Sequence, residues 1–291
     1  VFPGAGIAVS GAIAGMVAEL VMHPLDTLSH RAKVHPTGKY GSFWGSARNI
    51  VREEGIRAVW AGWKVTALVA GPSSAVYFGV YHVLRNSMLP YATSRTQENL
   101  IFLGCGAVAE LHATALFVPF DIVRCRLQLG SNPRRATGGV LERERPYSSI
   151  SASMKDIVRA EGWRGLYSGA GTVVVLECAL TALQFAFYEN IRWSLRKRFG
   201  DEYHTPIGFV AGGSAGFLAA IATNPLDTVV SRLMAQGRNR RFGTGPIAVF
   251  RSCLNEGWPA LWRGTLSRAM AIAPMNAIQF GVFDILRGIL T

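Results

Sequence analysis

Six long stretches of mainly apolar residues recur along the chain, and a few polar positions interrupt each of them. They cover residues 7–22, 65–84, 100–118, 172–187, 207–222 and 265–286. With its helical flanks, each stretch is long enough to cross about 30 Å of hydrocarbon at about 1.5 Å of rise per residue. The pattern therefore predicts six membrane-crossing helices.

The interruptions are ionisable or amide side chains, which are costly in lipid and normally face a bundle interior or a watery cavity. They are Glu19, His23, Glu110, His112, Glu177, Arg268 and Gln279. Six tilted helices around an aqueous centre fit this pattern better than six rods bathed in lipid. We expect Glu19, His23, Glu110 and His112 to be ionisable groups of the cavity.

A two-part motif occurs three times at nearly even intervals. Its first part is Pro24-Leu25-Asp26, Pro119-Phe120-Asp121 and Pro225-Leu226-Asp227, and its second part is Glu54-Gly55, Glu161-Gly162 and Glu256-Gly257. The chain thus divides into three repeats, at residues 1–92, 93–199 and 200–291. Because a proline removes a backbone donor and kinks its helix, the three kinked helices should converge and close one end of the cavity.

The repeat extends beyond these residues. An arginine follows each aspartate by five positions, and an aromatic-x-Gly triplet follows each Glu-Gly pair. The arginines are Arg31, Arg126 and Arg232, and the triplets end at Gly62, Gly169 and Gly264. Between the long stretches lie polar amphipathic segments, at residues 42–53, 148–160 and 247–255, which predict helices on the membrane surface.

Composition agrees with a membrane protein: 49% of the residues are hydrophobic, 16% are charged, and the net charge is +12. The cations are spread over the loops without a basic groove motif, so nucleic-acid binding is not expected. The four cysteines lack metal-ligand spacing, and no nucleophile–base pair recurs. We therefore expect no metal, no cofactor other than bound lipid, and no enzymatic activity.

These motifs closely resemble the signature of the mitochondrial carrier family over essentially the whole chain. The resemblance implies an all-α membrane protein with six tilted transmembrane helices in three pseudo-symmetric repeats, each with a short surface helix. It also implies a multi-pass protein of the mitochondrial inner membrane that works by alternating access. No removable presequence is expected, because the first residues lead directly into the first helix.

In the family, a matrix-side gate pairs each Pro-x-Asp acid with a base three positions after the acid of the neighbouring repeat. Those positions are Ser29, Arg124 and Val230 here, so only Asp26 with Arg124 should form such a pair. Gln128 matches the family's bracing glutamine, whereas Lys33 and Met234 do not. By resemblance the gate comprises Pro24, Asp26, Pro119, Asp121, Arg124, Gln128, Pro225 and Asp227.

The family's opposite gate uses an aromatic-acid-x-x-base motif on the even-numbered helices. The matching residues here are Tyr81, Arg85, Glu189, Arg192, Asp284 and Arg287. In the first repeat His82 replaces the acid. Two gates with incomplete bonding fit a cycling carrier, and they fit equally a gate that no longer cycles.

The family's substrate contact points fall on Val69, Leu176, Glu177 and Ala271, with Arg268 as the nearest cation. The family also binds cardiolipin phosphates at helix N-termini, where free backbone donors favour anions. The matching positions here are Gly41, Gly62, Gly169, Gly243 and Gly264, with Gly41 grouped with Gly62, and Gly243 with Gly264.

The subfamily likeness is greatest to the mitochondrial phosphate carrier, through the third repeat and through Glu110, nine residues before Pro119. Against it, the cavity lacks the cation that phosphate needs. Two functions are therefore expected: a phosphate-carrier-like solute carrier, for phosphate with protons or for a cationic or zwitterionic solute, or a transport-inactive accessory subunit of a respiratory-chain complex.

Overall fold

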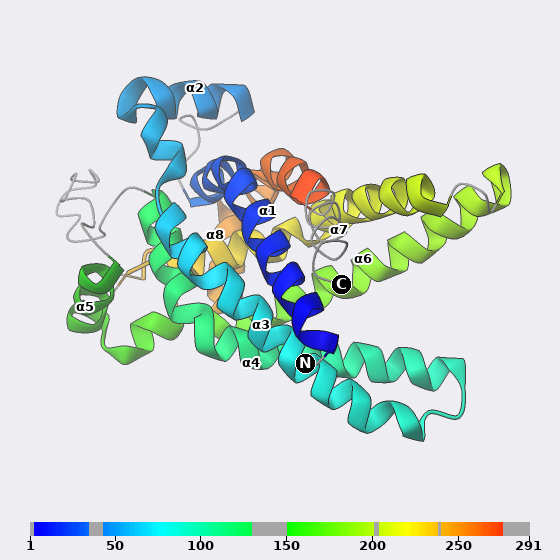
Figure 1. The fold of residues 1–291 in the computed structure, drawn as a ribbon. Helices are drawn as coiled ribbons and strands as arrows, with labels where there is room; N and C mark the ends of the chain where they lie inside the picture. Colours follow the sequence, from blue (N-terminus) through cyan, green and yellow to red (C-terminus); the bar gives the residue numbers. More distant parts are fainter. Residues whose placement is uncertain (1–2, 35–42, 130–149, 201–203, 238–239, 276–291) are drawn as a thin grey trace.

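The computed structural model describes residues 3–34, 43–129, 150–200, 204–237 and 240–275, and every regular element within them is helical (Figure 1). The all-α class expected from the sequence is thus confirmed over the described residues. Gly41, Gln279, Asp284 and Arg287, which the sequence analysis singled out, lie outside them.

Each repeat contains a long helix, a short amphipathic helix, a 3-10 turn and a second long helix. In the first repeat these are α1 (Pro3–Val34), α2 (Phe43–Glu54), η1 (Ile56–Trp60) and α3 (Trp63–Met88), followed by the turn η2 (Leu89–Tyr91). In the second they are α4 (Arg95–Leu129), α5 (Ile150–Glu161), η3 (Trp163–Tyr167) and α6 (Ala170–Phe199). The third has α7 (His204–Ala235), α8 (Pro246–Asn255), η5 (Trp258–Trp262) and a helix whose described part covers residues 265–275.

The long helices pack in a closed order around a common centre. α1 contacts α3, α4 and α7, and α4 contacts α3, α6 and α7, while α6 lies along α7. Pro24, Pro119 and Pro225 lie inside α1, α4 and α7, and each helix continues for about three turns beyond its proline. The C-terminal halves of these three helices therefore meet at one end of the molecule, which we call the gate end.

The short helices α2, α5 and α8 keep their apolar side against the bundle. Ile50, Ile157 and Val249 are buried in the three helices, whereas Trp44 on α2 is 78% exposed. In Figure 1, α2 and α5 lie outside the bundle of long helices. This arrangement suits helices that lie in the membrane interface, where an exposed tryptophan contacts the headgroup region.

Three stretches of the described residues combine sufficient length with an apolar composition for crossing a membrane: Ile56–Tyr91, Gly104–Gln128 and Trp163–Phe199. α1 and α7 have 32 residues each, which corresponds to about 48 Å at the rise of an α-helix. Their length is thus also sufficient for crossing a membrane.

Candidate functional site

Three buried arginines join the repeats at the gate end. Arg31, Arg126 and Arg232 are each 1% exposed, and the Nε of each donates a hydrogen bond to a backbone carbonyl of another repeat. The acceptors are the carbonyls of Gln128 at 2.7 Å, Met234 at 3.1 Å and Lys33 at 3.0 Å, respectively. The first repeat thus binds the second, the second binds the third, and the third binds the first.

The same guanidinium groups bind the glutamates of the three Glu-Gly pairs. Arg31 contacts Glu54 at 2.8 Å, Arg126 contacts Glu161 at 2.5 Å and 2.9 Å, and Arg232 contacts Glu256 at 2.7 Å and 2.8 Å. We call these six side chains and the three carbonyls the arginine ring. Because Glu54 and Glu161 end their short helices and Glu256 directly follows α8, the ring fixes each short helix, the long helix of the same repeat and the next repeat together.

Glycines allow the repeats to approach closely next to this ring. Gly62 and Gly169 are the left-handed N-caps of α3 and α6, and Gly264 has a φ of 73°. A Cβ at Gly264 would lie 2.9 Å from the carbonyl oxygen of Ser29, and one at Gly169 would lie 3.1 Å from Cβ of Leu233. Only glycine meets both demands, because other residues rarely adopt a positive φ.

Next to the ring lies a second group of polar side chains, which we call the gate layer. It consists of the three aspartates that precede the ring arginines on their helices, with their partners: Asp26, Asp121, Asp227, Lys33, Arg124, Gln128 and Arg268. Oδ2 of Asp26 accepts a hydrogen bond from Nε2 of Gln128 at 2.9 Å, and its Oδ1 lies 3.5 Å from Nε2 of His30. Gln128 therefore contacts a gate aspartate of the neighbouring repeat, as a bracing glutamine would.

The expected pair of Asp26 with Arg124 is not what the structure shows. Arg124 instead lies 3.5 Å from Glu19 and 3.4 Å from Asp121, one turn earlier on its own helix. These two carboxylates compete for the guanidinium, while Gln128 and His30 occupy Asp26. The prediction overlooked that Glu19, on the neighbouring α1, faces Arg124.

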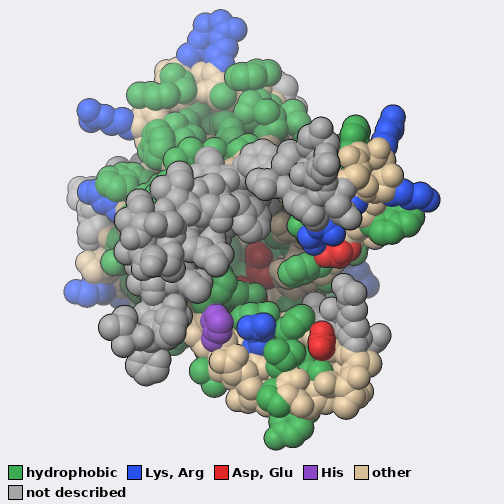
Figure 2. Space-filling view, turned by 45° about the vertical axis from the view of Figure 1, so that its right-hand side comes forward, with side chains coloured by type: hydrophobic (Ala, Val, Ile, Leu, Met, Phe, Trp, Pro, Cys, Tyr) green, Lys and Arg blue, Asp and Glu red, His purple; other side chains and the backbone are tan. Residues whose placement is uncertain are grey.

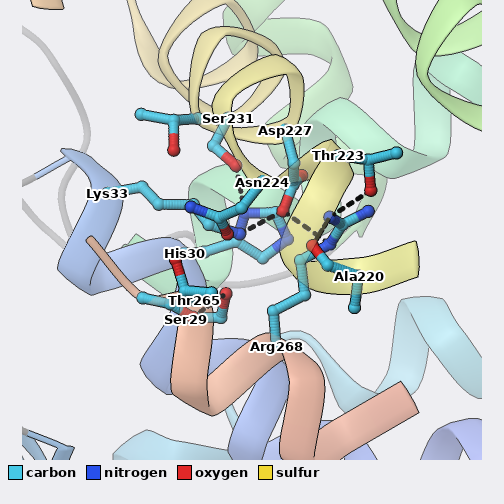
Figure 3. A network of polar contacts seen from close by, with 12 residues as sticks. Ser29, His30, Lys33, Ala220, Thr223, Asn224, Asp227, Ser231, Thr265 and Arg268 are labelled. Atoms are coloured by element: carbon cyan, nitrogen blue, oxygen red, sulfur yellow. Dashed lines mark hydrogen bonds and ion pairs between the residues drawn. The ribbon is translucent and has the colours of Figure 1, made fainter. Parts of the chain in front are cut away.

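Asp227 also differs from the expectation, because it has two cationic partners (Figure 3). Lys33 donates a hydrogen bond to Oδ2 of Asp227, and Nε of Arg268 lies 2.9 Å from the same oxygen. Lys33, at a position where the resemblance implies a neutral brace, thus supplies the charge missing at Ser29. Arg268 serves this cluster and does not face the cavity as the substrate cation that the sequence analysis considered.

A cavity of about 210 Å³ lies on the inner side of the gate layer. Its lining includes four carboxylates and one guanidinium, and these charged groups are Glu19, Glu110, Asp121, Glu177 and Arg124. Figure 2 shows acidic side chains deep in a hollow between the helices. The described lining is therefore acidic, and the one cation among these residues already contacts two of the carboxylates.

Comparison with known proteins accounts for this threefold architecture. The family described as "Mitochondrial carrier protein" matches residues 4–92, 96–199 and 201–291. The chain belongs to the mitochondrial carrier protein family. It is therefore a multi-pass membrane protein of a family of mitochondrial transporters, with the fold that the sequence resemblance implied.

Similar proteins within the family are named for different solutes. "Mitoferrin" of Dictyostelium discoideum is 28% identical, over 97% of this chain and 93% of the relative. "Mitochondrial succinate-fumarate transporter 1" of Arabidopsis thaliana is also 28% identical, over 97% and 91%. "S-adenosylmethionine carrier 1, chloroplastic/mitochondrial" of Arabidopsis thaliana is 27% identical, over 95% and 76%.

Of the family's substrate contact points, Val69 and Glu177 line the cavity. Leu176 is 4% exposed and packs in the apolar core with residues of α4 and α7, and Ala271 is buried outside the cavity lining. The prediction for these two is wrong, because neighbouring positions of one helix face different directions. Threonines and a serine that the sequence did not single out also line the cavity, namely Thr66, Ser73 and Thr114.

Two histidines predicted as cavity groups have other surroundings. His23 is 1% exposed, its Nε2 lies 2.8 Å from the carbonyl oxygen of Ala61, and its Nδ1 lies 3.2 Å from the hydroxyl of Thr66. It therefore fixes α1 to the start of α3. His112 is exposed and its Nδ1 contacts the carbonyl oxygen of Val108 at 2.8 Å, on its own helix. Neither lines the cavity, contrary to the prediction.

The residues of the opposite gate contact their own or an adjacent helix. Glu189 and Arg192 form a 4.0 Å pair within α6, and Arg192 also lies over the ring of Tyr188. Tyr81 stacks on Tyr77 within α3, and Arg85 lies over the ring of Phe102 on α4. These contacts do not close the centre of the bundle in the described part of the chain.

A second cavity, of about 300 Å³, lies between the second and third repeats at the gate end. It places Gly169, at the start of α6, near Gly245 and Pro246, at the start of α8, and Arg164 and Arg240 also line it. Residues of two repeats thus line this cavity, and the expected cardiolipin grouping of Gly243 with Gly264 stays a prediction.

Proposed function

We propose that this carrier moves a positively charged solute across the mitochondrial inner membrane by alternating access. The single observation that carries the proposal is the charge of the central cavity, which four carboxylates and one already paired arginine line. A desolvated solute needs compensating charge, so this lining favours a cation and disfavours an anion.

Arg124 pairs with Glu19 and Asp121, so the other two cavity carboxylates, Glu110 and Glu177, are the best candidates for solute contact. Glu110 accepts a hydrogen bond from the hydroxyl of Thr114 at 3.1 Å. Glu177 lines the cavity on α6, at a position that matches the family's contact points. Both lie in the membrane-spanning part of the bundle, where a carboxylate is costly without a function.

The names of the relatives can be compared with this charge. Succinate and fumarate are dianions, whereas S-adenosylmethionine carries a sulfonium and an ammonium group and has a net positive charge. None of the relatives described above is named as a phosphate carrier, and phosphate would require a free cation, which the described residues of the cavity do not provide. The acidic lining therefore supports a solute of the S-adenosylmethionine type, an organic cation, over phosphate.

Transport into liposomes tests the proposal. Purified protein is reconstituted with cardiolipin, and uptake of labelled S-adenosylmethionine, lysine, succinate and phosphate is measured. We expect uptake of a cation alone, and Glu177→Gln should lower it by about tenfold or more, which equals a loss of about 1.4 kcal/mol of stabilisation. Glu98→Gln is the control, because Glu98 is exposed in the first turn of α4, lies outside the cavity and belongs to neither gate.

Uptake of succinate or phosphate would contradict the proposed charge class. Inactivity with every solute, together with co-purification of a respiratory complex, would favour the alternative of an accessory subunit. That alternative was motivated by an incomplete gate. Asp227 has two partners, Lys33 and Arg268, that the sequence did not reveal, and these contacts weaken the case for an accessory subunit.

We also propose that the 300 Å³ cavity between the second and third repeats holds a cardiolipin phosphate. The starts of α6 and α8 meet there, so free backbone N–H groups and the positive ends of two helix dipoles point to one region. Arg164 and Arg240 add positive charge. Cardiolipin should raise the melting temperature of the purified protein, and Arg164→Gln should reduce that rise more than Arg52→Gln on α2 does.

A further inference from the structure

The three boundaries between repeats differ in the gate layer. Between the first and second repeats, Asp26 accepts a hydrogen bond from neutral Gln128, and Arg124 contacts Glu19 at 3.5 Å. The side chains of Arg124 and Glu19 are 26% and 37% exposed, so water screens this ion pair.

Between the second and third repeats the gate layer has an apolar contact. Val230 and Met234 of α7 pack in one cluster with Ile122 and Val123 of α4. The ion pair of Asp121 is with Arg124 of its own helix, so it does not join the two repeats.

Between the third and first repeats the contact is ionic and buried. The side chains of Lys33 and Asp227 are 1% and 11% exposed. Nη1 of Arg268 donates hydrogen bonds to the carbonyl of Ala220 and the hydroxyl of Thr223, both at 2.8 Å, while its Nε lies 2.9 Å from Asp227. Arg268 therefore holds Asp227 within the third repeat, and Lys33 of the first repeat binds it from the other side (Figure 3).

Further polar contacts strengthen this boundary. Nδ1 of His30 lies 3.1 Å from the hydroxyl of Ser231, and the hydroxyl of Ser29 donates a 3.4 Å hydrogen bond to the carbonyl of Gly264. Separating the first and third repeats would leave Lys33 without its buried counter-charge, which is strongly unfavourable, whereas Asp227 would keep Arg268 of its own repeat. Separating the second repeat from the third would expose apolar surface and break the hydrogen bonds of Arg126 with the carbonyls of Met234 and Gln236, but Arg126 would keep Glu161 of its own repeat.

We propose that Lys33 is a positioning residue of the transport cycle. It supplies the cation that Ser29 and Val230 lack, and together with Arg268 it keeps Asp227 bound between the first and third repeats. Those two repeats move as one unit when the gate end begins to open, and the second repeat moves away from them first. The inference rests on the alternating access of the proposed function but on no particular solute.

Distances between spin labels test this order of movement without any transported solute. Labels are attached to cysteines at Arg48 on α2, Lys155 on α5 and Arg251 on α8, in a chain whose native cysteines are replaced, in lipid nanodiscs. All three sites are exposed and lie on the surface helix of one repeat each. The distance between sites 48 and 251 should have a narrow distribution, and both distances to site 155 should be broader.

Variants of Lys33 extend the test. Lys33→Gln should broaden the 48–251 distribution to the width of the other two, and Lys33→Arg should keep it narrow, because the charge remains. Gln128→Ala is the matched control, since Gln128 occupies the same position in the second repeat. It should broaden the 48–155 distribution and leave the 48–251 distribution unchanged.

Two results would overturn the proposal: a wild-type 48–251 distribution as broad as the other two, or no response of it to Lys33→Gln. If Lys33→Gln does not fold, the three wild-type widths and the Lys33→Arg variant still decide. Because no solute is present, failure here is distinct from failure of the proposed cation transport, which the liposome assay measures.

Discussion

The arginine ring and the gate layer are adjacent regions at the same end of the molecule, yet only the ring repeats its contacts three times. In the ring, an arginine, a glutamate and a carbonyl meet at each of the three boundaries, with similar distances throughout. In the gate layer the boundaries have an amide brace, an apolar contact and a buried ion cluster. The comparison separates a region that holds the repeats together from a region whose bonding differs at each boundary.

Removing one arginine of the ring should cause the largest loss of folding stability. Arg126→Ala should destabilise the protein by about 3–5 kcal/mol, because Glu161, which is 10% exposed, would remain as an uncompensated buried charge. Thermal unfolding in detergent, followed with a thiol-reactive dye, measures this loss, since Cys105, Cys125 and Cys253 are buried in the fold. A stability loss no larger than that of a gate-layer variant would contradict the distinction.

The tight contact beside the ring gives the next largest effect. Gly264→Ala should cost about 1–3 kcal/mol from the positive φ alone, and the new Cβ would in addition collide with the carbonyl oxygen of Ser29. Gly71→Ala is the control, because a Cβ there meets nothing within 4 Å inside a helix. Melting temperatures of the two variants should therefore shift to different extents, and equal shifts would show that the close approach is unimportant.

Substitution of a gate-layer aspartate should have little effect on folding stability. Asp121→Asn should change the free energy of unfolding by less than about 1 kcal/mol, because its ion pair with Arg124 is partly exposed and within one helix. Chemical denaturation measures the change. A loss comparable to that of Arg126→Ala would indicate that Asp121 also joins repeats.

The smallest effect concerns the most exposed glutamate of the ring, Glu256. Burial alone would raise the pKa of its carboxyl group, but the hydrogen bond and charge of Arg232, aided by Arg263, outweigh burial and lower the pKa below its ordinary value. A carboxylate with a lowered pKa stabilises the fold at neutral pH. That contribution should be lost as the pH falls from the ordinary glutamate value of about 4.3 through the lower value in the fold.

Melting temperatures measured between neutral and acidic pH test this prediction. The wild type should lose more stability on acidification than Glu256→Gln, which lacks the titrating group. Identical pH profiles would mean that Arg232 does not lower the pKa of Glu256.

The sequence predicts the ring better than the gate layer, for a physical reason. Arg31, Arg126, Arg232 and the three Glu-Gly pairs recur at fixed spacing, and residues at equivalent places in equivalent repeats meet equivalent partners. The spacing indicated that these residues matter, but the identity of the carbonyl acceptors required coordinates.

The gate layer could not be predicted by position alone. A lysine side chain is long and flexible, so Lys33 reaches Asp227 from one helical turn beyond the usual base position. Arg124 had three carboxylates within range, and the choice among Glu19, Asp121 and Asp26 depends on helix packing that no motif records. In the cavity, Val69 and Glu177 were found by resemblance, whereas Leu176 was misplaced by one step around its helix.

The acceptors of the ring arginines are main-chain oxygens, and this choice has a consequence for how such a chain can change. Lys33, Gln128 and Met234 have nothing in common as side chains, yet each offers the same carbonyl to its arginine. A substitution at any of these three positions keeps the backbone carbonyl that the arginine binds, while it changes the side chain beside the gate layer. The contacts of the gate layer can thus change in evolution while the arginine ring that joins the repeats is retained.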